Sequence, residues 1–222
     1  MKPAIYHLTF PSQYLLTSTL MRAQEFYESP VYQGKVFTHE EYMDWYAQDR
    51  GSMSYFTDWN GFNLPSATLD HFFRLNKDLS NKEKALFRRL KKLPRPFYLI
   101  ATHQAGGGST LAHEVVHGLF YLNRKYACDV LETVESLPTK KMLKAISQMG
   151  YADSVLTDEL NAYATTGLPS CLSASDMAPH EKAAVRILKK QLLSVFRRHF
   201  NFSIGSKKGL KTLSSLAKSI TL

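Results

Sequence analysis

A chain of 222 residues with 44% hydrophobic and 12% aromatic residues can bury the core of one domain, and this composition excludes an intrinsically disordered protein. No stretch approaches about 18 consecutive apolar residues, and the N-terminus lacks the apolar core of a secretory signal. We therefore expect a cytoplasmic protein without a transmembrane segment, with non-classical export left open. The net charge of +9 arises in residues 181–222, which hold ten Lys and Arg and one acidic residue, whereas the rest of the chain is neutral.

The N-terminal hundred residues predict helices with short strands between them. Two capping boxes, Thr38 with Glu41 and Ser80 with Glu83, mark helix starts. The expected helices cover residues 12–28, 39–48, 66–75 and 81–93. Residues rich in β-formers predict strands at 31–37 and 52–56, and a turn-rich stretch predicts a packed loop at 58–65.

The second half of the chain predicts one strand followed by helices. The β-forming run at 97–103 leads into a Gly-rich link at 104–109, which lets the chain turn into a helix that contains the sequence HEVVH. Further helices are expected at 126–136, 139–149, 155–166 and from Asp176 to about Phe200. Residues 206–222 predict either a short amphipathic helix or a mobile tail.

These elements predict an α+β fold that is mostly helical, with a small sheet. We expect one domain over residues 1–203, of which 1–96 form a helical and sheet part and 97–203 form the part with the metal site, followed by a basic C-terminal tail at 204–222. The basic segment 181–222 favours an anionic partner, either nucleic acid or lipid headgroups. The alternative is a solvated helix face with a polar tail. The oligomeric state is left open.

The segment TLAHEVVHGLFYLN, residues 110–123, places His113 and His117 one helical turn apart. On a helix they share a face and can direct their imidazole nitrogens at one metal ion, while Glu114 can reach a water beside it. Most other positions are apolar, so we expect a buried helix, in which unpartnered polar groups are costly. The alternative is that these histidines are core residues bonded to backbone carbonyls, or part of a polar face.

A catalytic zinc site needs a third protein ligand, and the segment TDELNAYATTG, residues 157–167, offers Glu159. Glu159 follows His117 by 42 residues, which is long enough for two helices to return the chain to the site. Asp158 is the rival carboxylate, although its place in the first helical turn favours interaction with the helix dipole. We therefore expect Zn²⁺ held by His113, His117 and Glu159. A strand with a free edge at 97–101 would bind a peptide substrate beside the metal.

HEVVH, the strand FYLIA before it and DELNAYA after it resemble the gluzincin branch of zinc metallopeptidases. That branch has HExxH on the active-site helix, an edge strand before it and a glutamate on a later helix as third ligand. The resemblance covers about residues 97–166 and implies a zincin-like fold and a zinc-dependent hydrolase that cleaves peptide bonds. No third histidine lies six residues after His117, so the chain departs from the metzincin pattern.

In the mechanism that we expect, Glu114 takes a proton from the attacking water and passes it to the leaving amine. The oxyanion needs a further hydrogen-bond donor, and the candidates, in order, are Tyr163, His199, His103 and Tyr121. Each has a structural alternative, because the tyrosines suit a core, His199 suits a surface and His103 suits a turn.

Two other functions stay open. The zinc could be structural or part of a catalytically inactive binding module, but such sites are often rich in cysteine, and Cys128 and Cys171 do not have ligand spacing. We expect these cysteines to be reduced thiols, with a disulfide or metal role as the alternative. The protein could also bind nucleic acid or an anionic membrane through residues 181–222, in which case HEVVH is incidental.

Overall fold

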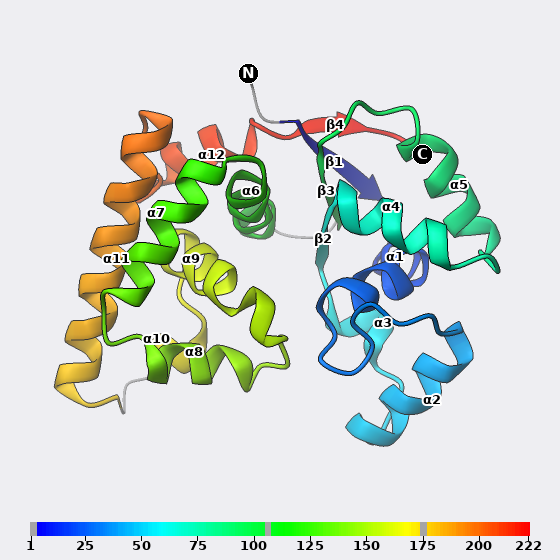
Figure 1. The fold of residues 1–222 in the computed structure, drawn as a ribbon, viewed down its shortest axis with the longest axis horizontal. Helices are drawn as coiled ribbons and strands as arrows, with labels where there is room; N and C mark the ends of the chain where they lie inside the picture. The colour runs from blue at the N-terminus through cyan, green and yellow to red at the C-terminus, as the bar shows by residue number, and fades with distance from the viewer. Residues whose placement is uncertain (1–3, 105–107, 174–176) are drawn as a thin grey trace.

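The computed structural model describes residues 4–104, 108–173 and 177–222 and has an α+β fold. A small sheet lies in the middle, with one group of helices on each side of it (Figure 1). Residues 105–107 of the predicted Gly-rich link and the predicted start of the last long helix at Asp176 lie outside the described residues. Within the described part of the chain, no helix combines the length and the apolar character needed to cross a membrane.

The sheet is mixed, and within the described residues its strand order is β2-β3-β1-β4. β1 (Ile5–Phe10) and β3 (Tyr98–His103) run parallel, β4 (Lys218–Ile220) runs parallel to β1, and β2 (Gly61–Pro65) runs antiparallel to β3. The prediction that 97–101 form an edge strand is therefore wrong, because β3 pairs on both sides. Its unbroken apolar run is what a central, doubly covered strand requires.

One of the two outer strands of the sheet is β2, which lies in the segment predicted to be a packed loop. Gly61 and Asn63 are turn-forming residues by composition, and this concealed the strand. The predicted strands at 31–37 and 52–56 are also wrong. The first forms turns and extended chain with Gly34 at a φ of 71°, and the second runs into the short helix α3 (Tyr55–Asp58).

Aromatic residues in these two segments pack instead of pairing. Tyr32 contacts the rings of Phe37, Tyr42 and Trp45, and Tyr55 contacts Tyr42. Their β propensity therefore reflects a preference for packed surfaces.

Helices of the N-terminal half cover one face of the sheet. Both predicted capping boxes are confirmed, with reciprocal bonds between Thr38 and Glu41 and between Ser80 and Glu83. Besides α3, the helices are α1 (Gln13–Glu28), α2 (His39–Arg50), α4 (Ser66–Leu75) and α5 (Asn81–Leu90).

Helices of the C-terminal half cover the other face. α6 (Gly108–Leu122), which carries HEVVH, lies directly on the sheet, and a Cβ added at Gly118 would come within 3.0 Å of Ile5 and Tyr98. The remaining elements are α7 (Arg124–Glu135), α8 (Lys140–Ser147), the 3₁₀ helix η1 (Asp153–Val155), α9 (Leu156–Thr166), α10 (Ser170–Ser173), α11 (Pro179–Phe200) and α12 (Lys207–Ser214).

The segment 204–222 is built into the fold and is not a separate tail. The amphipathic helix expected there is present as α12, whose Leu213 is buried in the same core as α6. Beyond it, β4 extends the sheet beside β1. The basic residues of α12, Lys207, Lys208 and Lys211, face the solvent.

Candidate metal centre

The HEVVH helix places its apolar side against the sheet and its polar side toward a pocket. Ala112, Val115 and Val116 are fully buried in the core, whereas His113 and Glu114 line the pocket. Helical spacing produces this division, because residues three and four apart share one side of the helix.

Three side chains meet at the base of the pocket: His113 and His117 of α6 and Glu159 of α9, here called the metal cluster. The Nε2 atoms of the two histidines are 3.2 Å apart. Glu159 lies 3.4 Å from His117 Nε2 through Oε1 and 3.6 Å from His113 Nε2 through Oε2. One ligand atom from each residue lies within 4.8 Å of the others, so the fold brings together the three ligands expected from the sequence.

Asp158 fixes the orientation of His117. Its Oδ2 lies 2.9 Å from His117 Nδ1, which donates to it, so that Nε2 is the nitrogen that faces the cluster. Asp158 is therefore not confined to the helix-dipole role expected for it. Burial disfavours protonation of His117, but the carboxylates of Asp158 and Glu159 outweigh this effect and raise the pKa of the imidazole well above its ordinary value.

Thr166 has the corresponding role for His113. The Thr166 hydroxyl donates to the carbonyl of Ala162 at 2.7 Å, so at 3.3 Å from His113 Nδ1 it can only accept. His113 Nδ1 therefore carries a proton, and its Nε2 faces the metal cluster. The ring of Tyr163 packs against His113 with the centroids 4.5 Å apart, which restricts rotation of the imidazole.

The metal cluster has the properties of a cation site. The Nε2 atoms of two imidazoles and a carboxylate converge within a few ångströms, and Glu159 Oε2 is buried without a hydrogen-bond partner. Although burial favours the neutral acid, His117 and His113 hold the pKa of Glu159 below its ordinary value, so the carboxylate is charged. Two histidines with one carboxylate fit Zn²⁺.

Glu114 is held beside the cluster by a residue of the edge strand. Its Oε2 accepts a hydrogen bond of 2.7 Å from Asn63 Nδ2, and the Tyr98 hydroxyl donates to Asn63 Oδ1. Burial raises the pKa of Glu114, while His113 and His117 oppose this shift. Gly61 permits the close approach of β2 to α6, because a Cβ added at Gly61 would lie 2.8 Å from Thr110 and 3.6 Å from Glu114 Oε1. Asn63 was missed because its strand was predicted as a loop.

Of the four expected oxyanion donors, Tyr163 is the one that lines the pocket. Its hydroxyl lies 3.1 Å from that of Tyr151, and burial raises the pKa of Tyr163 to about 12, so both hydroxyls are protonated donors at neutral pH. Tyr151 was not found from the sequence, because nothing in its local pattern indicates that η1 and α9 turn it toward the metal cluster.

The other three candidates lie elsewhere. His199 of α11 lies 2.8 Å from Asp129 of α7 through Nε2 and packs on Tyr126. His103 contacts Asn60 at 3.0 Å, and Tyr121 packs on Tyr98. None of the three is among the described residues that line the pocket. The long final helix carries His199 into the α7 side of the core, which sequence spacing alone cannot predict.

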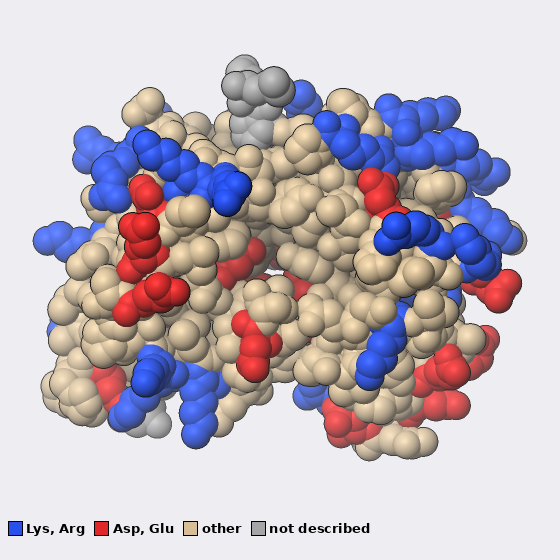
Figure 2. Space-filling view, viewed as in Figure 1, with Lys and Arg blue, Asp and Glu red and all other residues tan. Residues whose placement is uncertain are grey.

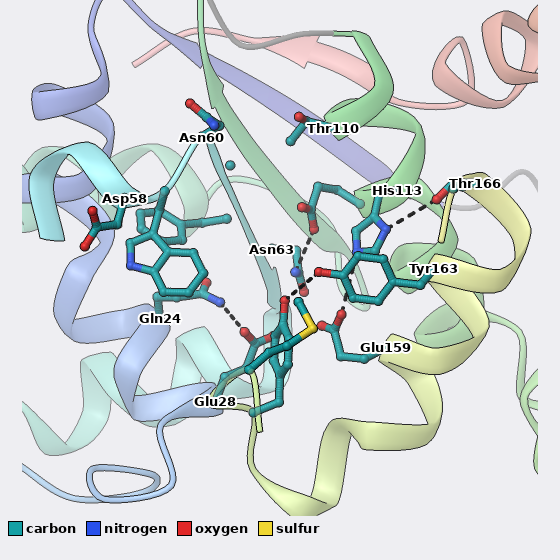
Figure 3. A pocket seen from close by; sticks show the side chains of 18 of the residues that line it. Gln24, Glu28, Asp58, Asn60, Asn63, Thr110, His113, Glu159, Tyr163 and Thr166 are labelled. Atoms are coloured by element: carbon teal, nitrogen blue, oxygen red, sulfur yellow. Dashed lines mark hydrogen bonds and ion pairs between the residues drawn. The ribbon is translucent and has the colours of Figure 1, made fainter. Parts of the chain in front are cut away.

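The pocket has a volume of 490 Å³, within the range of small-molecule and peptide sites. It lies between the two helical groups, and Figure 2 shows acidic side chains around the hollow at the centre of this face. Figure 3 shows α6 and α9 on one side of it and α1 on the other. The residues of α1 and its C-cap that line it are Gln24, Glu25, Glu28 and Ser29, here called the α1 wall.

Comparisons with models of known families, with curated proteins and with solved structures find no match for this chain.

Proposed function

We propose that the protein is a zinc-dependent hydrolase of the gluzincin type, with a zincin-like arrangement around its active site, that cleaves peptide bonds. The observation that carries the proposal is the convergence of His113, His117 and Glu159, with one carboxylate oxygen buried and unpartnered, beside a fourth side chain, Glu114, that is not needed as a ligand.

Two histidines and one glutamate are a ligand set of catalytic zinc sites. Imidazole suits zinc, copper, iron and nickel, whereas calcium and magnesium prefer oxygen ligands alone. Three protein ligands leave a fourth position open, as in catalytic zinc sites, and a zinc ion bound there would lower the pKa of a water and polarise a substrate carbonyl. Asp158 and Thr166 hold the two imidazoles in the tautomer that presents Nε2 to the metal.

Glu114 is placed to act as the general base. Asn63 occupies Oε2 and leaves Oε1 on the side of Gly61 and the pocket. Burial raises the pKa of Glu114 and so brings it closer to neutral pH, where a general base accepts a proton and returns it most efficiently. Tyr163, with Tyr151 behind it, can donate to an oxyanion from the opposite side of the metal cluster.

A peptide substrate can add to the sheet at β2. Among the described residues, β2 has a strand partner only on the β3 side, and Gly61, Phe62 and Asn63 line the pocket. An extended peptide paired with the open side of β2 would gain backbone hydrogen bonds and would pass the metal cluster. We therefore assign to residues 61–65 the substrate-binding role that was predicted for 97–101.

The proposal is tested by metal content and hydrolysis measured on the same preparations. Wild-type protein should bind about one zinc per chain, and His117→Ala should lose it. Glu114→Gln should keep the zinc and lose hydrolysis of a peptide library by about 10²- to 10⁴-fold. His180→Gln, an exposed histidine of α11, is the matched control and should change neither quantity. Absence of zinc from wild-type protein refutes the proposal.

A catalytically inactive zinc-binding domain is the second candidate. It shares the metal cluster, and it predicts that Glu114→Gln alters no activity of the zinc-loaded protein. The buried bond between Asn63 and Glu114 argues against it, because a structural zinc site has no need of a carboxylate held beside the ligands.

Binding of an anionic partner is compatible with either candidate. The upper parts of the face in Figure 2 carry many Lys and Arg side chains, and the exposed lysines of α12 contribute to the charge of residues 181–222. Affinity for nucleic acid or anionic vesicles should then fall steeply with salt. Affinity that does not change with salt rules this role out.

A further inference from the structure

The charge of the pocket is opposite to that of the protein. The chain carries a net charge of +9, yet no Lys or Arg is among the described residues that line the pocket. Five carboxylates do line it: Glu25, Glu28, Asp58, Glu114 and Glu159. The metal cluster and the general base account for two of them. The α1 wall contributes two more, and no function has been assigned to these.

Glu28 has no cationic partner among the described residues. Its carboxylate accepts a hydrogen bond of 2.6 Å from the amide of Gln24, and no ion pair involves it. It reaches into the pocket from α1, opposite Glu159 on α9 (Figure 3). A half-buried carboxylate with a neutral partner is costly unless a ligand supplies the positive charge.

Gln24 supplies a second, independent sign of a missing ligand. Its side chain is 6% exposed, and its Oε1 is buried without a hydrogen-bond partner, while its Nε2 is used by Glu28. Unpaired buried acceptors are rare in folded proteins. Gln24 Oε1 and Glu28 are therefore two acceptors on one wall of the pocket, which is the pattern that a group with several N–H donors satisfies.

The position of these residues in the helix strengthens the preference for a cation. Glu25 and Glu28 lie in the last turn of α1, which contains no basic residue. The carboxyl end of a helix carries a partial negative charge, so acidic residues there are unfavourable and a cation is favourable.

We propose that Glu28 and Gln24 form a subsite for a substrate ammonium group, so that the enzyme cleaves peptides beside a positively charged residue. This inference rests on the proposed function and adds the substrate class. The ammonium group can come from a free peptide N-terminus or from a lysine side chain. In both cases its N–H groups would donate to Glu28 and to Gln24 Oε1 while the peptide bond lies at the metal cluster.

The test compares matched peptides that differ only in one charge. One pair has a free or an acetylated N-terminus, and the other has lysine or norleucine beside the cleaved bond. Wild-type zinc-loaded enzyme should prefer the charged member of one pair by about ten- to a hundredfold in kcat/KM. The pair that shows the preference identifies the source of the ammonium group. Equal rates within both pairs overturn the proposal.

Glu28→Gln should reduce this ratio to near one. Glu132→Gln, which removes the same charge from an exposed position on α7, is the matched control and should retain the ratio. Gln24→Leu should lower the ratio several-fold, and it provides a second variant if Glu28→Gln does not fold. Retention of the full preference in Glu28→Gln refutes the subsite.

A binding measurement separates failure of the subsite from failure of the proposed function. The same peptides are titrated calorimetrically into zinc-loaded Glu114→Gln protein and into the Glu114→Gln/Glu28→Gln double variant. If no peptide is hydrolysed but the charged members bind in a Glu28-dependent way, the hydrolase proposal falls and the subsite stands. If hydrolysis is observed without a charge preference in rate or binding, the subsite falls and the hydrolase proposal stands.

Discussion

Two buried glutamates of this protein have opposite surroundings. Glu83 is 1% exposed and Glu159 is 2% exposed. Glu83 receives two bonds from Arg22, at 2.8 and 2.9 Å, and a third from the backbone of Ser80. Glu159 faces two imidazoles and has an oxygen without a partner. The first carboxylate is satisfied by the chain itself and joins α1 to α5. The second is left open, which is expected where an external ion completes the site.

The largest expected effect comes from removal of the partner of Glu83. Arg22→Met should lower the free energy of unfolding by about 3–5 kcal/mol, because Glu83 would remain buried without a counter-charge. Denaturant unfolding measures the change. The double variant Arg22→Met/Glu83→Gln should recover part of the loss, and a loss below about 1 kcal/mol would show that Glu83 is not held mainly by Arg22.

Zinc should stabilise the protein through Glu159 and not through Glu83. At a free zinc concentration about a thousand times the dissociation constant, the free energy of unfolding should rise by about 4 kcal/mol. The melting temperature measured with and without zinc reports this difference. Glu159→Gln should abolish the zinc-dependent increase, whereas Arg22→Met should lower stability and keep the increase. An equal zinc response in both variants contradicts the distinction between the two sites.

The residues that orient the metal cluster should have a smaller effect than the ligands. Asp158→Asn leaves the three ligands in place but weakens the bond that fixes His117, so zinc affinity should fall about ten- to a hundredfold. Competition with a chelator measures the affinity. Asp153→Asn, the matched control in the preceding 3₁₀ helix, should have no effect. Unchanged affinity in Asp158→Asn would mean that His117 is held by packing alone.

Glu25 is an intermediate case with neutral partners, among them the Tyr55 hydroxyl at 2.7 Å. Burial raises its pKa from 4.5 to about 6, so the folded state binds the proton more tightly than the unfolded state. As the pH rises from about 4.5 through 6, loss of this proton therefore lowers the free energy of unfolding. The loss reaches at most about 2 kcal/mol at neutral pH. Glu25→Gln should be more stable than wild type by this amount at pH 7 and equal to it below pH 4.5. Denaturant titrations over this range measure the difference, and a constant difference would contradict it.

The sequence predicted what local periodicity determines. Helices with capping boxes were found with nearly correct bounds, and the spacing of His113 and His117 on one helix predicted that they share a face. Glu159 was identified because a third ligand was required chemically and a carboxylate lay on a later helix. These are features that a segment of about ten to fifteen residues specifies by itself.

The features that were missed depend on contacts between distant segments. β1 was not predicted at all, and β2 was hidden in a turn-like composition, so the edge strand was assigned to β3. The roles of Asn63 and Glu28 depend on how β2 and α1 lie around α6, which the sequence did not predict. His199 is a residue type that could serve as a hydrogen-bond donor, but it lies beside Asp129 and outside the lining of the pocket. Residue type alone cannot indicate which of several histidines lines the pocket.

The pairing of β4 with β1 has a consequence for how the protein is made. Tyr6 lies opposite Lys218, so two segments more than two hundred positions apart must meet before the sheet is complete. Contacts of such long range slow folding, and during synthesis the first strand emerges long before its neighbour. Because α12 covers α6 in the same segment, a chain shortened at residue 203 would expose the helix that carries His113 and His117, and it should aggregate instead of yielding a smaller folded protein.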